Sequence, residues 1–209
     1  NNYVKFADKY WRIVRINGDG TVRVIYDGTS AHANGESSSD RQIGTSAFNS
    51  SFNDNAYVGY MYGATGASTY AAAHANTNDS TIKAYIDNWY KANILGTANE
   101  EYLADNIFCN DRSIRSNKPN KGYNNLGYGT NATAYRWYYF ANSSYNNKMM
   151  LTCPQQNDAF TVSDTTKGNG ALTYPVGLLS TDEIVLAGGW HEENSGYYLY
   201  SGQNWRASS

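Results

Sequence analysis

Residues 11–28 read WRIVRINGDGTVRVIYDG, and this stretch gives the clearest structural signal in the chain. Apolar and polar side chains alternate over Trp11–Ile16 and again over Thr21–Tyr26, a period of two that is typical of strands. The residues between them, Asn17-Gly18-Asp19-Gly20, are turn formers, and Asn-Gly between alternating runs is the strongest local signal of a hairpin. The sequence therefore predicts an antiparallel hairpin that ends at Asp27-Gly28.

Three later segments are predicted to form short helices. Over Thr81–Asn93 apolar residues recur every three or four positions, with Asp79 or Ser80 as the N-cap and Gly96 as the stop. A capping-box pattern at Thr97-Ala98-Asn99-Glu100 predicts a second helix that ends near Asp105. A capping box at Ser180-Thr181-Asp182-Glu183 predicts a third over Ile184–Ala187, stopped by Gly188-Gly189. The apolar face of the first helix comprises Ile82, Tyr85, Ile86, Trp89 and Tyr90.

Further strands are predicted through Ile107-Phe108-Cys109 and at Tyr197–Tyr200, with a short strand inside the irregular stretch Ile43–Tyr62. Strands and helices do not alternate regularly, and no repeat is visible. The predicted fold class is therefore α+β, with an N-terminal hairpin, two or three short helices and an irregular, loop-rich second half.

Composition bounds both the core and the partners. Leu, Ile, Val and Phe together make up only about 16% of the 209 residues, whereas the chain has 20 Tyr and 5 Trp. Aromatic rings are therefore expected to build much of the core. The net charge of −2 predicts no nucleic-acid partner, and the lack of a long apolar run predicts no membrane insertion.

Two polar stretches are expected to lie on the surface. His32–Asp40 is small and polar and is predicted to be a mobile loop. Arg112–Thr133 is predicted to be a solvated basic loop, and its cations are Arg112, Arg115, Lys118 and Lys121. The aromatic run Tyr135–Phe140 has two readings, a strand buried on one face or an aromatic binding rim.

No catalytic, cofactor or metal motif is complete. His191 precedes Glu192 and Glu193, a pair that could orient a catalytic base, but the chain has no nucleophile motif, and the zincin spacing is missing. Asn53-Asp54-Asn55 and Asn76–Asp79 could supply oxygen ligands to calcium, although turns and caps explain them more simply. The sequence therefore predicts a protein that is not an enzyme and that holds no metal or cofactor.

The last third of the chain combines large rings with adaptable polar groups. Such a mixture suits a binding surface, because Tyr and Trp contribute contact area at a low entropy cost. The predicted ligand-binding residues are Trp190, Tyr197, Tyr198, Tyr200, Asn204, Trp205 and Arg206. Cys109 and Cys153 could form one disulfide if their Cα atoms lie within about 7 Å of each other.

Six strings in the chain carry a resemblance, and they span Trp11–Thr29, Ile43–Gly63, Tyr102–Ile114, Leu151–Asp164, Gly168–Gly189 and Tyr197–Trp205. Together they resemble a group of bacterial surface and prepilin-associated proteins. The C-terminal domain of that group is similar to the C-type lectin fold, in the branch shared with formylglycine-generating-enzyme-like domains and retroelement variable proteins. The resemblance implies an extracellular domain at the cell surface whose C-terminal half binds a glycan or protein ligand, and it does not imply catalysis.

The chain departs from these relatives at residues 204–209. They usually read YWTMSP where this chain reads NWRASS, and they continue into a closing pair of strands. We therefore expect a single C-type-lectin-like domain over residues 1–209 that is either truncated or completed in another way. An open sheet edge would allow strand-mediated self-association. Two alternatives to ligand binding remain: a structural pilus or surface subunit, and a glycan-acting enzyme that uses His191 with Glu192 or Glu193.

Overall fold

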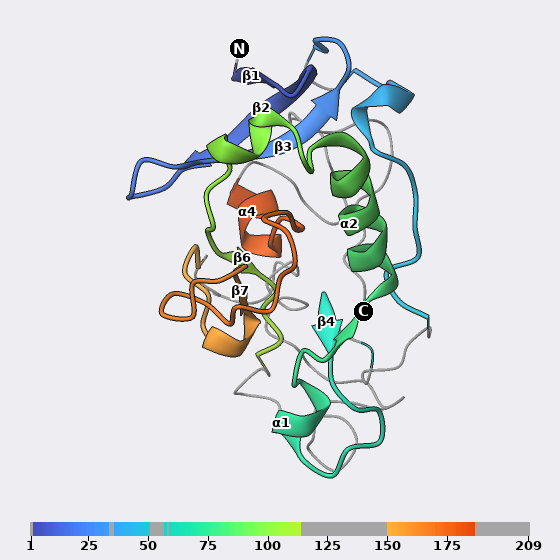
Figure 1. Ribbon diagram of the computed structural model, residues 1–209, viewed down its shortest axis with the longest axis vertical. Helices are drawn as coiled ribbons and strands as arrows, with labels where there is room; N and C mark the ends of the chain where they lie inside the picture. Colours follow the sequence, from blue (N-terminus) through green and yellow to red (C-terminus); the bar gives the residue numbers. More distant parts are fainter. Residues whose placement is uncertain (1, 34–35, 51–56, 58, 114–149, 187–209) are drawn as a thin grey trace.

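The computed structural model describes residues 2–33, 36–50, 57, 59–113 and 150–186. As predicted, the fold is mixed α+β, with small antiparallel sheets and few helices (Figure 1). The strands are β1 (Tyr3–Phe6), β2 (Lys9–Ile16), β3 (Val22–Gly28), β4 (Met61–Tyr62), β5 (Asn78–Asp79), β6 (Phe108–Cys109) and β7 (Ala159–Phe160). The helices are α1 (Tyr70–Ala73), α2 (Thr81–Asn93) and α4 (Thr181–Leu186), with 3₁₀ turns η1 (Ser39–Arg41), η3 (Ala98–Tyr102) and η5 (Gln156–Asp158).

The predicted hairpin is confirmed as β2 and β3. The Asn17 amide donates to the Thr21 carbonyl at 2.8 Å, and Gly20 adopts a positive φ of 84° that a glycine tolerates. An irregularity in pairing between Ile13 and Arg15 places Arg15 opposite Arg23. Because an extra residue re-aims the side chains that follow it, this bulge interrupts the simple alternation of the sequence.

A third strand, β1, extends this sheet and was not predicted. It pairs with β2 from Tyr3↔Arg12 to Phe6↔Lys9, which leaves Ala7 and Asp8 as a two-residue turn. Both turn residues have positive φ, 51° and 55°, as a tight hairpin turn of type I′ requires. Ala-Asp is a poor sequence signal for such a turn, because Asn-Gly and Asp-Gly are the usual pairs.

Helix α2 has the predicted bounds and the predicted cap. The Ser80 side chain accepts a hydrogen bond from the Lys83 amide, and Gly96 follows the helix with a φ of 75°. In Figure 1 the helix lies beside the three-stranded sheet. Trp89 of α2 contacts Trp11 of β2 and Tyr26 of β3 edge to face, at centroid distances of 6.0 and 5.7 Å.

Replacing Ser80 with Ala should lower the free energy of unfolding by about 1–2 kcal/mol. Ser80 is 1% exposed, and its hydroxyl both caps α2 and donates to the Tyr60 carbonyl at 2.7 Å. Urea unfolding of Ser80→Ala beside Thr69→Ala, which removes the exposed cap of the single-turn helix α1, measures the difference. Equal losses in the two variants would contradict the buried role of Ser80.

The main apolar cluster lies where α2 meets the two small sheets. Tyr60, Ile86 and Phe160 are at its centre, and the rings of Tyr60 and Phe160 meet edge to face at 5.9 Å. Met61 and Leu172 complete the buried set. Aromatic rings thus share the described core with aliphatic side chains, and the charged side chains buried around this core were not predicted.

Candidate functional site

The predicted ligand-binding residues lie outside the described residues. These are Trp190, Tyr197, Tyr198, Tyr200, Asn204, Trp205 and Arg206, together with the alternative catalytic set His191, Glu192 and Glu193. The described residues that lead toward this segment belong to α4. Residues 187–209 are called the tail below, and the contacts of α4 show how the helix that precedes the tail is held against the rest of the molecule.

Helix α4 begins with the predicted capping box. The Ser180 amide donates to Glu183 Oε2 at 2.9 Å, and the Glu183 amide donates to Ser180 Oγ at 3.2 Å. Glu183 Oε1 also lies 3.3 Å from Arg15 Nε and 3.6 Å from Arg23 Nε, and the Glu183 side chain is 6% exposed. Arg15 and Arg23 are opposite each other in the sheet, and their like charges repel. The negative charge of Glu183 offsets this repulsion, and its contacts with the two arginines hold α4 against the sheet.

Cys109 and Cys153, the two candidates for a disulfide, are bonded to each other with a Cα–Cα distance of 5.4 Å. Cys109 belongs to β6, which pairs with β7 in the register Phe108↔Phe160 and Cys109↔Ala159. The bond therefore joins both ends of segment 110–152 to one small sheet.

Arg112 stabilises the junction between segment 110–152 and the β6–β7 sheet. The prediction that Arg112 is solvated is wrong. Its side chain is fully buried, Nε donates to Asp158 Oδ1 at 2.8 Å, and its backbone amide donates to Asp158 Oδ2 at 2.7 Å. Its Nη1 donates to the Met61 carbonyl at 2.8 Å. Burial raises the pKa of the Asp158 carboxyl, whereas the Arg112 charge acts in the opposite direction. Arg115, Lys118 and Lys121 lie outside the described residues.

The close packing around Arg112 requires Gly59. A Cβ at Gly59 would lie 2.8 Å from Arg112 Cδ, and the φ of 122° is one that residues with a side chain rarely adopt. Arg112 Nη2 also donates to Asn76 Oδ1 at 2.8 Å. This amide oxygen belongs to one of the two clusters considered as calcium ligands, and here it serves the buried guanidinium instead. The other cluster, Asn53-Asp54-Asn55, lies outside the described residues.

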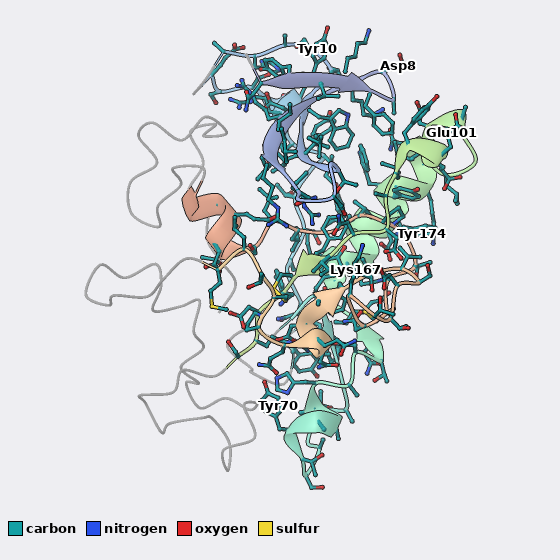
Figure 2. All side chains as sticks on the ribbon, turned by 90° about the vertical axis from the view of Figure 1, so that its left-hand side faces the viewer. Asp8, Tyr10, Tyr70, Glu101, Lys167 and Tyr174 are labelled. Carbon is teal, nitrogen blue, oxygen red and sulfur yellow. A yellow bond between two sulfur atoms is a disulfide. The ribbon has the colours of Figure 1, made fainter. Side chains whose placement is uncertain are left out.

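His74 and Tyr70 lie next to the buried Arg112. Their rings stack with a centroid distance of 4.1 Å, and Tyr70 Oη donates to the Arg112 carbonyl at 3.2 Å. Burial lowers the pKa of His74 to about 4, so the ring is neutral at pH 7. Figure 2 shows Tyr70 at the opposite end of the described part from Asp8 and Tyr10.

A second charged cluster lies on the N-terminal sheet. The two carboxylate oxygens of Asp27 accept hydrogen bonds from Arg12 Nε and from Arg41 Nε, with an N–O distance of 2.8 Å in each case. All three side chains are about 2% exposed. Arg12 lies on β2, Asp27 on β3 and Arg41 in η1, so this bridge attaches the segment after β3 to the sheet. A carboxylate held by two guanidinium groups has its hydrogen-bonding capacity well satisfied despite burial.

His32 belongs to the same cluster, and its predicted position on the surface is wrong. The side chain is 5% exposed, with Nδ1 2.9 Å from Glu36 Oε1 and Nε2 2.8 Å from Asp40 Oδ1. The sequence carries a weak signal for one contact, since His32 and Glu36 are four residues apart. The contact with Asp40 depends on the turn η1, which sequence periodicity did not reveal.

Ser30, His32 and Glu36 stand in the order of a nucleophile, a base and an orienting acid. Ser30 Oγ lies 3.3 Å from His32 Nε2. However, Asp40 contacts the same nitrogen at 2.8 Å, so that nitrogen is a proton donor to a carboxylate. It therefore has no lone pair with which to accept a proton from Ser30, and the geometry does not favour nucleophilic catalysis.

Within the described ranges, no group of three or more His, Cys, Asp or Glu side chains is arranged to hold a metal ion. In the same part of the chain, no helix combines the length and apolarity needed to cross a membrane. Comparison of the chain with models of protein families, with curated proteins and with solved structures found no match.

Proposed function

We propose that this chain is a non-catalytic, extracellular ligand-binding or adhesion domain of a bacterial surface protein, with a C-type-lectin-like fold. The observation that carries the proposal is the Cys109–Cys153 disulfide, reinforced by the buried Arg112–Asp158 pair. Disulfides persist in oxidising environments such as the cell exterior, which supports the extracellular location. The observed mixture of small antiparallel sheets and short helices is compatible with the proposed fold.

Two features support binding rather than structure alone. The disulfide fastens both ends of segment 110–152, which is rich in Tyr and Asn, to the β6–β7 sheet. Glu183 fastens the helix that precedes the tail, which carries Trp190, Tyr198 and Trp205. Recognition sites are commonly built from Tyr- and Asn-rich segments on a rigid scaffold, because the scaffold limits the entropy lost on binding.

The contacts of His32 favour a non-catalytic role over the enzymatic alternative. The one Ser–His–Glu arrangement among the described residues has its histidine tied to two carboxylates. The remaining catalytic candidates, His191, Glu192 and Glu193, are tested directly by substitution.

Arrays of immobilised glycans and proteins test the proposal. The wild-type chain should bind a ligand, and the triple variant Trp190→Ala/Tyr198→Ala/Trp205→Ala should lose at least tenfold in affinity, because large rings dominate binding energy at such surfaces. Tyr102→Ala is the matched control, since Tyr102 is 73% exposed on the scaffold and belongs to no predicted site.

Binding that the triple variant retains at wild-type strength would contradict the site assignment. Absence of binding in the wild type, with turnover of a glycan that His191→Ala abolishes, would replace the proposal with the enzymatic alternative. Circular dichroism of each variant shows that the scaffold is intact.

A further inference from the structure

Both ring nitrogens of His32 face a carboxylate at hydrogen-bonding distance. Nδ1 lies 2.9 Å from Glu36 Oε1, and Nε2 lies 2.8 Å from Asp40 Oδ1. A neutral imidazole carries a single N–H, so one of the two carboxylates would then face a lone pair of the ring. This arrangement is therefore attractive on both sides only when His32 is protonated.

The surrounding charges also require the protonated ring. The cations that face the cluster are Arg12 from β2 and Arg41 from η1, and the anions are Asp27 from β3 with Glu36 and Asp40. A protonated His32 makes three cations for three carboxylates, whereas a neutral one leaves an excess negative charge. Tyr3 from β1 adds a phenol that accepts a hydrogen bond from the His32 amide at 2.8 Å, and Arg12 Nη2 donates to the His32 carbonyl at 2.6 Å.

We propose that His32 is a proton-controlled latch that fastens the Glu36 side chain to the N-terminal sheet and releases that side chain when the ring loses its proton. The Glu36 side chain is the group that leaves, because it is 46% exposed and its other hydrogen bond comes from the Ala33 amide. The Glu36 backbone stays attached, because its carbonyl accepts a hydrogen bond from Arg41 Nη1. Asp40 stays in place, because it also accepts hydrogen bonds from the Thr29 amide and from Ser38.

The direction of titration agrees with this geometry. Burial lowers the pKa of His32, but the hydrogen bonds with Glu36 and Asp40 outweigh it and hold the pKa above its usual value. The hydrogen bond from His32 lowers the pKa of Glu36 below its usual value. A histidine with a raised pKa stabilises the folded state fully below its unfolded pKa of about 6.5, and this contribution is lost as the pH rises through the folded pKa. The latch is therefore closed in mildly acidic solution and opens on the alkaline side of that folded value.

Nuclear magnetic resonance of the wild-type chain tests the latch directly. The ring ¹⁵N signals of His32, assigned by their loss in His32→Asn, should show both nitrogens protonated at pH 6 and a midpoint above 6.5. The Ala33 amide and the Glu36 carboxyl should shift with the same midpoint. His74 is an internal control, because its pKa is lowered to about 4 and its ring should stay neutral throughout this range.

Two outcomes would overturn the proposal. One is a His32 midpoint at or below the ordinary value. The other is a raised midpoint that the Ala33 and Glu36 signals do not follow. Glu36→Gln provides a second test, since it keeps an acceptor for the Ala33 amide but removes one carboxylate from the ring. The latch predicts that this variant has a lower His32 midpoint than the wild type, and an unchanged midpoint would contradict it.

Discussion

Replacing Arg112 with Met should lower the free energy of unfolding by about 3–5 kcal/mol, because it leaves the Asp158 carboxylate buried without its counter-charge. The substitution also deprives the Met61 carbonyl and the Asn76 amide oxygen of a hydrogen-bond donor. Equilibrium unfolding in urea, with a check that the slope is unchanged, measures the loss.

Two companion variants identify the cause of that loss. The double variant Arg112→Met/Asp158→Asn removes the unpaired charge, but its Asn side chain keeps an oxygen that can accept a hydrogen bond from the backbone amide of residue 112. This variant should therefore recover part of the lost stability. Lys167→Met breaks the exposed pair with Asp164 and should change stability little, since Lys167 is 55% exposed and solvent screens the pair. An Arg112→Met loss no larger than that of Lys167→Met would show that the buried pair does not stabilise the junction.

Removing the disulfide by Cys109→Ser/Cys153→Ser should cost about 4 kcal/mol. The bond connects residues 44 positions apart, and releasing it restores conformational freedom to the unfolded chain over that whole loop. Urea unfolding of the double variant beside the oxidised wild type gives the difference, and intact mass before and after reduction verifies the bond.

The disulfide variant also separates stability from binding. If the bond mainly constrains the unfolded state, the double variant at low temperature should keep the hydrogen bonds of the β6–β7 register, seen as slow amide exchange at Phe160. Loss of that protection while α2 remains protected would show that the bond also holds the native junction together. A loss of stability below 1 kcal/mol would contradict the loop-closure account.

The elements predicted correctly from sequence are those specified by neighbouring residues. The β2–β3 hairpin depends on Asn17–Gly20, and α2 depends on Ser80, Gly96 and a spacing of three and four. The box at Ser180 forms as expected. The box at Thr97 begins a 3₁₀ turn rather than an α-helix, because Glu100 accepts from the Gly96 amide at 2.8 Å and from Tyr90 Oη at 3.1 Å.

The elements that sequence reasoning missed depend on distant partners. Arg112 lies in a polar stretch typical of a loop, and its burial depends on Asp158, 46 residues away. His32 depends on Asp40 through the turn η1, and β1 depends on a turn without glycine or asparagine. The sheet bulge before Arg15 likewise has no marker in the sequence, although it decides which side chain meets Glu183. Hydrophobic patterning is uninformative at such positions, because it treats every charged residue as exposed.

The predicted binding residues differ from these cases, because composition and resemblance indicate them and periodicity does not. Their role depends on a surplus of aromatic rings beyond what the core uses. In the described part, Tyr60, Tyr90 and Phe160 are buried, while Tyr102 is exposed. Ring content alone therefore does not decide whether an aromatic side chain lies in the core or on the surface.

Hydrogen–deuterium exchange, measured with and without a ligand found on the arrays, shows which residues the ligand covers. We expect the ligand to slow exchange within residues 187–209 and to leave exchange at the scaffold amides of α2 and β2 unchanged. Slowed exchange confined to segments outside residues 187–209 would contradict the proposal that the Trp- and Tyr-rich tail binds the ligand.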